Sequence, residues 1–97
     1  IMTIRFSRLA DLDLEGIYHY IADHSSDEAA QSVVRSIEGT LHRLADFPHV
    51  GRSRGDLSPG LRSIPVQSYL IQYRIENDDV YVVRIAYGSQ DMPALLG

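Results

Sequence analysis

Residues 51–74 read GRSRGDLSPGLRSIPVQSYLIQYR, and residues 80–91 read VYVVRIAYGSQD. The first of these stretches opens with a glycine-rich connection that carries Arg52 and Arg54 and ends beside Arg62. Beyond this connection, apolar and polar residues alternate, a pattern typical of strands. A small protein that holds a cationic connection against a pair of strands is suited to binding a partner.

Three strands are expected in this half of the chain. Residues 61–66 form the first, with Pro65 at an edge or bulge because proline cannot donate to a ladder. Residues 69–75 alternate cleanly and predict a strand with two unlike faces. Residues 77–79, Asn-Asp-Asp, are typical of a turn, so residues 80–87 are predicted to return as the other arm of a hairpin.

Two amphipathic helices are expected before these strands. Ser7 is the predicted N-cap of a helix that reaches about residue 24, and Ser25 with Glu28 has the form of a capping box for a second helix that ends near residue 46. The two apolar stripes follow helical spacing: Ala10, Leu14, Ile17 and Ile21, then Ala30, Val34, Ile37, Leu41 and Leu44. With a short strand at residues 3–6, the order is β-α-α-β-β-β. This predicts an α+β fold in which a helical hairpin packs on a small antiparallel sheet.

The composition limits the kind of protein. The 97 residues are 44% apolar and 23% charged, which fits one globular domain over residues 2–97, with Ile1 ahead of Met2 left out of the fold. Cysteine is absent and the four histidines lack a tight metal-ligand spacing, so we expect neither a metal nor another cofactor. No apolar run approaches the ~20 residues that span a bilayer, and we expect a cytoplasmic protein that does not enter membranes.

The charges favour a protein partner. All nine cationic side chains are arginines, whose planar fork binds carboxylates or phosphates through two hydrogen bonds. The net charge is nevertheless −4, whereas proteins that bind nucleic acid through phosphates are usually basic. We therefore expect no direct sequence-specific binding of nucleic acid by this chain alone.

The chain resembles the ParE branch of the RelE/ParE toxin superfamily. The matching segments are DLEGIYHYIA at residues 13–22, the leucine–phenylalanine–proline end of the second helix, GRSRGDL at 51–57, GLRSIPV at 60–66, YLIQYR at 69–74 and VVRIAYGSQD at 82–91. They follow one another in order over nearly the whole chain. No one of them is decisive, but the ordered set is specific, and the family has the same order of helices and strands.

The resemblance implies the toxin of a type II toxin–antitoxin system, silenced by a ParD-like antitoxin whose C-terminal segment wraps around it. Studied members of this branch poison DNA gyrase by binding, without enzymatic activity. The RelE branch instead cleaves messenger RNA on the ribosome, and this is the alternative function. A third alternative is a non-toxic member that only binds its antitoxin. A fold alone does not decide among these.

Seven residues are candidates for contact with the target or the antitoxin: Arg52, Arg54, Arg62, Arg84, Tyr87, Leu12 and Tyr18. Leu12 and Tyr18 lie off the apolar stripe of the first helix. Apolar side chains exposed there would form a patch of the kind that binds a partner. No catalytic residue is expected of a binding toxin. A ribonuclease would instead need Arg54, Arg62 and Tyr87 around one phosphate.

These candidates also have structural alternatives. Arg52 and Arg54 could fix their loop through Asp56 or through backbone carbonyls, and the ring of Tyr87 could simply pack on the sheet. ParE-like sequences commonly carry histidine at the position of Tyr87. Its phenol could exchange protons only with a pKa shifted from about 10. The absence of lysine removes a residue type on which RelE-like ribonucleases rely.

Overall fold

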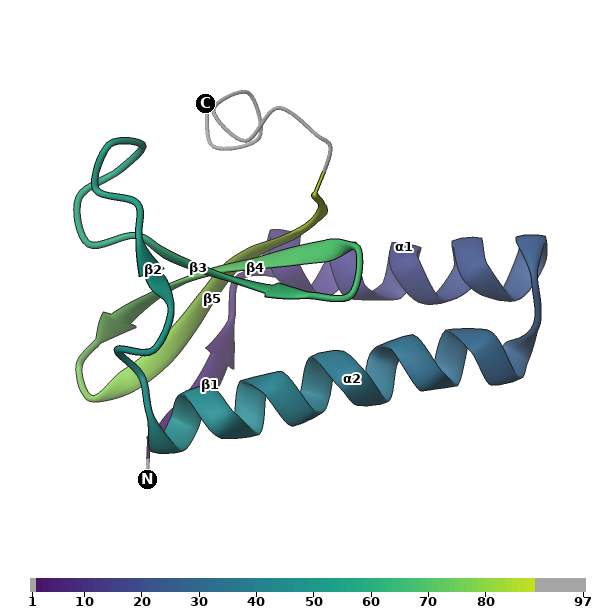
Figure 1. The fold of residues 1–97 in the computed structure, drawn as a ribbon, viewed down its shortest axis with the longest axis horizontal. Coiled ribbons are helices and arrows are strands. Elements are labelled where there is room, and N and C mark those ends of the chain that lie inside the picture. Colours follow the sequence, from purple (N-terminus) through teal and green to yellow (C-terminus); the bar gives the residue numbers. More distant parts are fainter. Residues whose placement is uncertain (1, 89–97) are drawn as a thin grey trace.

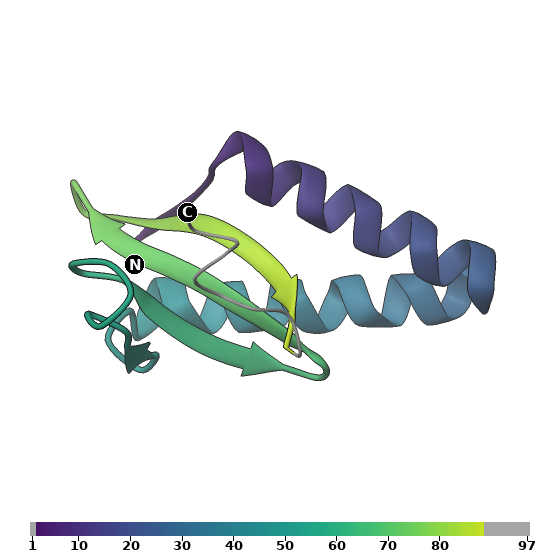
Figure 2. The same ribbon diagram turned by 90° about the horizontal axis from the view of Figure 1, so that it is seen from above.

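A computed structural model describes residues 2–88, in which two helices pack on one face of a five-stranded sheet (Figures 1 and 2). The elements are β1 (Thr3–Phe6), α1 (Arg8–His24), α2 (Asp27–Asp46), β2 (Arg52–Ser53), β3 (Arg62–Val66), β4 (Tyr69–Glu76) and β5 (Asp79–Tyr87). The predicted α+β class and helical hairpin are confirmed. The predicted order omits β2, a strand of only two residues.

Serine caps fix where the helices begin. Ser7 Oγ accepts a hydrogen bond of 3.0 Å from the Ala10 N–H, and Ser26 Oγ accepts one of 3.0 Å from the Ala29 N–H. The prediction that Ser25 caps the second helix was wrong by one residue. The Ser25 N–H instead donates to the Ile21 carbonyl at 2.8 Å and closes the end of α1. The hairpin connection is consequently very short, and the two helices run side by side (Figure 1).

The sheet has the order β1-β5-β4-β3-β2 and is mixed, because β1 pairs with β5 in parallel. The expectation of an antiparallel sheet therefore holds for β2 to β5 but not for β1. A tight turn forces antiparallel pairing, whereas the chain between β1 and β5 is long enough to permit either direction. Pro65 lies beyond the reach of β2, which pairs only with Arg62 and Ser63, so the predicted edge position is confirmed.

The turn between β4 and β5 has two residues. Asn77 and Asp78 have φ values of 52° and 63°, as a type I′ hairpin requires, and these residue types tolerate that conformation. Asp79 was predicted in the turn but already belongs to β5, where it pairs with Glu76. The hairpin therefore closes one residue earlier than expected.

The core lies between the helices and one face of the sheet. Its fully buried members include Ile37 and Leu44 from α2 and Ile71, Tyr73, Val80 and Val82 from the sheet. From α1 only Ala10 is buried, while Leu14 and Ile17 pack against this cluster partly exposed. No helix within residues 2–88 has the length and apolar character needed to cross a membrane.

Candidate functional site

A groove of about 700 Å³ opens between α1 and the end of the β4–β5 hairpin where Tyr69 pairs with Tyr87. The helix contributes Leu12, Gly16 and Tyr20, which recur every four residues and so share one face of α1. Leu12 is 51% exposed, Tyr20 61% and Tyr87 50%. The groove is therefore open to solvent and more apolar than polar, with three tyrosines among its lining residues.

Two tyrosine rings form the sheet side of the groove. Tyr69 and Tyr87 meet edge to face, with ring centroids 5.8 Å apart. Burial raises the pKa of Tyr69, and the neighbouring phenol of Tyr87 contributes in the same direction. The Tyr69 phenol is therefore neutral at physiological pH, and the groove presents ring surface together with hydroxyl groups that can donate or accept.

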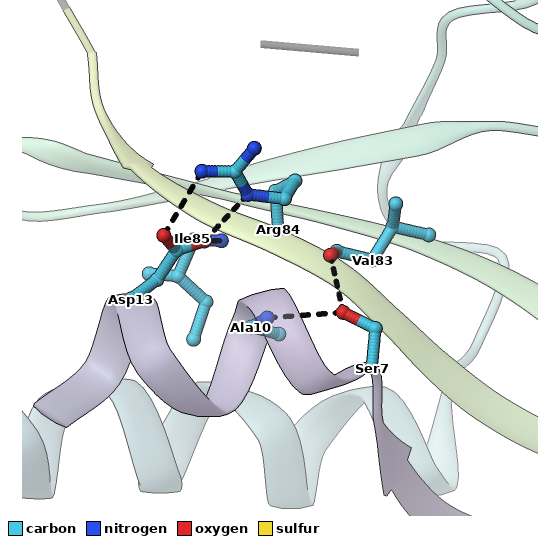
Figure 3. A network of polar contacts seen from close by, with 6 residues as sticks. All are labelled: Ser7, Ala10, Asp13, Val83, Arg84 and Ile85. Carbon is cyan, nitrogen blue, oxygen red and sulfur yellow. Dashed lines mark hydrogen bonds and ion pairs between the residues drawn. The ribbon is translucent and has the colours of Figure 1, made fainter.

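An ion pair holds α1 against β5 beside this groove (Figure 3). The Asp13 carboxylate accepts hydrogen bonds from Arg84 Nε at 2.8 Å and Arg84 Nη2 at 3.0 Å, and a third from the Ile85 N–H at 2.9 Å. Both side chains are mostly buried, being 17% and 18% exposed, and the pairing raises the pKa of Arg84. Arg84, a candidate contact residue, is thus engaged inside the molecule.

The same edge of β5 is bound by the start of α1. The Ser7 N–H donates to the Val82 carbonyl at 2.9 Å, and the Ser7 hydroxyl donates to the Val83 carbonyl at 2.6 Å. β1 ends at Phe6 and cannot pair with the rest of this edge of β5. Ser7 and Asp13 instead form hydrogen bonds with the backbone groups of β5 that no strand reaches. These contacts set the position of α1, and with it one wall of the groove.

The arginines of the glycine-rich connection lie elsewhere. Arg54 forms two hydrogen bonds of 3.2 Å with the Asp56 carboxylate, as the structural alternative predicted, and this pairing lowers the pKa of Asp56. Arg62 Nη1 donates to the His49 and Gly51 carbonyls at 3.2 and 2.8 Å. Arg52 is exposed on β2 and forms no ion pair within 4.0 Å among residues 2–88, but its charge also helps to lower the pKa of Asp56. Arg54 from within the connection and Arg62 from β3 thus both stabilise the connection.

The register places Tyr87 and Arg62 far apart. Tyr87 pairs with Tyr69, whereas Arg62 pairs with Tyr73, four residues further along β4. At ~3.3 Å per strand residue, the two rows are about 13 Å apart along the sheet, and Tyr87 and Arg62 also stand on opposite sides of β4. The three residues that a ribonuclease would need do not converge on one point.

The sequence predictions found only part of the groove. Leu12 and Tyr87, two candidates chosen separately, both line it, whereas Tyr18 does not and instead contacts the ring of His19 edge to face. Gly16 and Tyr20 were missed, although their spacing of four residues from Leu12 was a readable signal. Among residues 2–88, no three histidine or acidic side chains gather as a metal site would require.

Known proteins provide independent comparisons. The family model described as "ParE toxin of type II toxin-antitoxin system, parDE" matches residues 4–92. Toxin ParE3 of Caulobacter vibrioides is 35% identical over 85 residues, which cover 88% of this chain and 85% of that protein.

Solved toxin structures share the fold, among them the following two. A chain of the chromosomal ParDE toxin–antitoxin system from P. aeruginosa superposes with a TM-score of 0.77 at 23% identity, covering 89% of this chain and 95% of its own. A chain of the toxin–antitoxin complex RelBE2 from Mycobacterium tuberculosis gives 0.60 at 27% identity, covering 89% and 96%. The family match extends over most of the described fold, including α1 and β5, which form the groove. The chain belongs to the ParE toxin family of type II toxin–antitoxin systems.

Proposed function

We propose that this protein is a toxin that acts by binding DNA gyrase and that a ParD-like antitoxin silences it by occupying the α1–β5 groove. The observation that carries the antitoxin part is the groove itself. Leu12, Tyr20 and Tyr87 expose apolar surface in a groove that two small residues, Gly16 and Ala86, also line. An amphipathic helix can lay its apolar face into a groove of this kind.

The names of the similar proteins support an antitoxin partner. Both solved structures are described as toxin–antitoxin systems, ParDE and RelBE2. A cytoplasmic location follows from this proposal, because gyrase acts on the chromosome. The groove and the arginine connection lie at different ends of the sheet, so antitoxin and target need not compete for the same side chains.

Action by binding agrees with the chemistry of the described residues. Arg54, Arg62 and Arg84 are held by internal hydrogen bonds, and Tyr87 lies about 13 Å along the sheet from the row of Arg62. General acid–base cleavage of a phosphodiester requires such groups around one scissile bond. Gyrase as the target rests on the family resemblance.

Induced expression with and without the cognate antitoxin tests the function. The expected result is growth arrest, accumulation of gyrase–DNA cleavage complexes and intact transcripts, all prevented by co-expressed antitoxin. Transcripts cleaved in a ribosome-dependent way, with cleavage lost in Tyr87→Phe or Arg54→Ala, would establish the ribonuclease alternative. Unimpaired growth with tight antitoxin binding would identify a non-toxic member.

Substitution of Leu12 tests the antitoxin groove. Leu12→Glu places a charge in the apolar groove, and we expect affinity for the antitoxin to fall at least 30-fold, the scale of a central contact residue. Leu9→Glu is the matched control, because Leu9 is 52% exposed on the same helix but does not line the groove. Calorimetric titration of the purified toxin measures both. Equal losses in the two variants would contradict the proposed location.

A further inference from the structure

Six large apolar side chains are at least half exposed within residues 2–88. Three of them line the α1–β5 groove, and Leu9 stands near the start of α1. The other two, Phe47 at 65% and Val50 at 54%, lie together in the connection between α2 and β2. The groove does not account for this second apolar pair.

Residues 47–50, which we call the 47–50 turn, form a tight turn. The Val50 N–H donates to the Phe47 carbonyl at 3.2 Å, and Pro48 occupies the second position, where proline pre-sets the backbone of a β-turn. The turn follows directly on the end of α2, where the Phe47 N–H donates to the Arg43 carbonyl at 2.8 Å. Phe47 and Val50 therefore stand at the two ends of one turn.

Buried groups fix this turn from beneath. The Tyr73 hydroxyl donates to the Pro48 carbonyl at 2.7 Å and accepts from the Gly51 N–H at 2.9 Å, and Tyr73 is fully buried. Arg62 holds the His49 and Gly51 carbonyls. A loop so firmly held loses little conformational entropy when a partner binds it. The molecule thus presents two apolar side chains on a preorganised support.

The surroundings of the turn are cationic in an acidic protein. Residues 43–56 contain Arg43, Arg52 and Arg54 against Asp46 and the Arg54 partner Asp56, a formal charge of 3 − 2 = +1 in a chain of net charge −4. Arg43 and Arg52 are exposed, and among the described residues neither has a carboxylate oxygen within 4.0 Å of its guanidinium. A complementary partner would offer an apolar pocket with carboxylates at its rim.

We infer that the 47–50 turn is the surface with which this toxin grips its protein target: Phe47 and Val50 enter an apolar pocket, and carboxylates at its rim pair with Arg43 and Arg52. The inference rests on the proposed function, since it assigns the target-binding surface of a toxin that acts by binding. The turn adjoins the row of Tyr73, whereas the antitoxin groove lies at the row of Tyr69. The two surfaces are therefore separable by mutation.

The test uses the double variant Phe47→Ser with Val50→Ser, and Leu9→Ser as a matched loss of an exposed apolar side chain. Because both positions are exposed, we expect the variants to fold, and thermal unfolding checks this. We expect survival after induction to rise at least tenfold for the double variant. Retention of gyrase by immobilised toxin should fall at least tenfold, and antitoxin affinity should change less than twofold. Leu9→Ser should behave as the parent protein does.

The outcomes separate the inference from the proposed function. A double variant that arrests growth as strongly as the parent overturns the inference, and so does one that loses antitoxin and target together. If the parent protein retains no gyrase, the gyrase proposal fails. The survival of cells that express the double variant still decides whether the turn binds another target. Binding of duplex DNA by the parent alone, lost in the double variant, would assign the turn to nucleic acid and overturn a protein pocket.

Discussion

Replacement of Asp13 by asparagine should destabilise the protein strongly. The carboxylate accepts two hydrogen bonds from Arg84 and one from the Ile85 N–H, and the two side chains are only 17% and 18% exposed. Breaking a buried ion pair costs ~3–5 kcal/mol, because the remaining charge is left unpaired. Partial exposure and the oxygen that asparagine retains place the loss near the lower limit, at about 3 kcal/mol.

This loss is measurable by thermal and urea unfolding followed by circular dichroism. For a domain of this size 1 kcal/mol corresponds to ~4–8 °C, so the midpoint should fall by roughly 12–24 °C. Glu15→Gln is the matched control, since it removes one negative charge from an exposed position of the same helix and should change stability by less than about 0.5 kcal/mol. Equal effects of Asp13→Asn and Glu15→Gln would refute the assignment of Asp13 as the contact that fixes α1 to β5.

Three further predictions concern the interior. Gln72 is fully buried and neither of its amide atoms has a hydrogen-bond partner within residues 2–88, so Gln72→Met should raise the free energy of unfolding by about 1 kcal/mol, measured in urea. Gly51→Ala should lower it by about 1–3 kcal/mol, because the new methyl group would overlap the Tyr73 hydroxyl. Burial raises the pKa of Tyr73, so its stabilising contribution is complete below pH 10 and is lost as pH rises through the folded-state value. The difference in melting temperature between the parent and Tyr73→Phe should therefore be constant below pH 10 and shrink as the pH is raised above 10, and a constant difference there would contradict this.

Local patterns predicted the helices and long strands well. The stripe of Ile37, Leu41 and Leu44 fixes both the existence of α2 and the face that it buries. The choice between Ser25 and Ser26 as N-cap was not predictable in this way, since both are serines followed within three residues by an acidic side chain. Periodicity locates a helix, but the geometry of the connection selects its cap.

The sequence alone did not predict contacts between residues that are far apart along the chain. Asp13 read as one of several acidic residues off the apolar stripe, because its partners Arg84 and Ile85 lie 71 and 72 residues further along the chain. The two-residue β2 has no pattern of its own and exists only through its pairing with β3. The sequence predicted only part of the groove. The position of Leu12 off the apolar stripe made it a candidate contact residue, but only the fold brings it to Tyr87.

The parallel pairing of β1 with β5 has a consequence for synthesis of the toxin. Thr3 is aligned with Asp79, a separation of 79 − 3 = 76 residues, so β1 has no partner strand until residues 79–82 have left the ribosome. Pairing over such distances is slow, because loop closure must precede any stabilising contact. Asp13 likewise has no Ile85 N–H to bind until residue 85 has been made, so the α1 wall of the groove is fixed in place only late in synthesis. An antitoxin that binds the proposed groove would therefore find its complete site only after Tyr87 has left the ribosome.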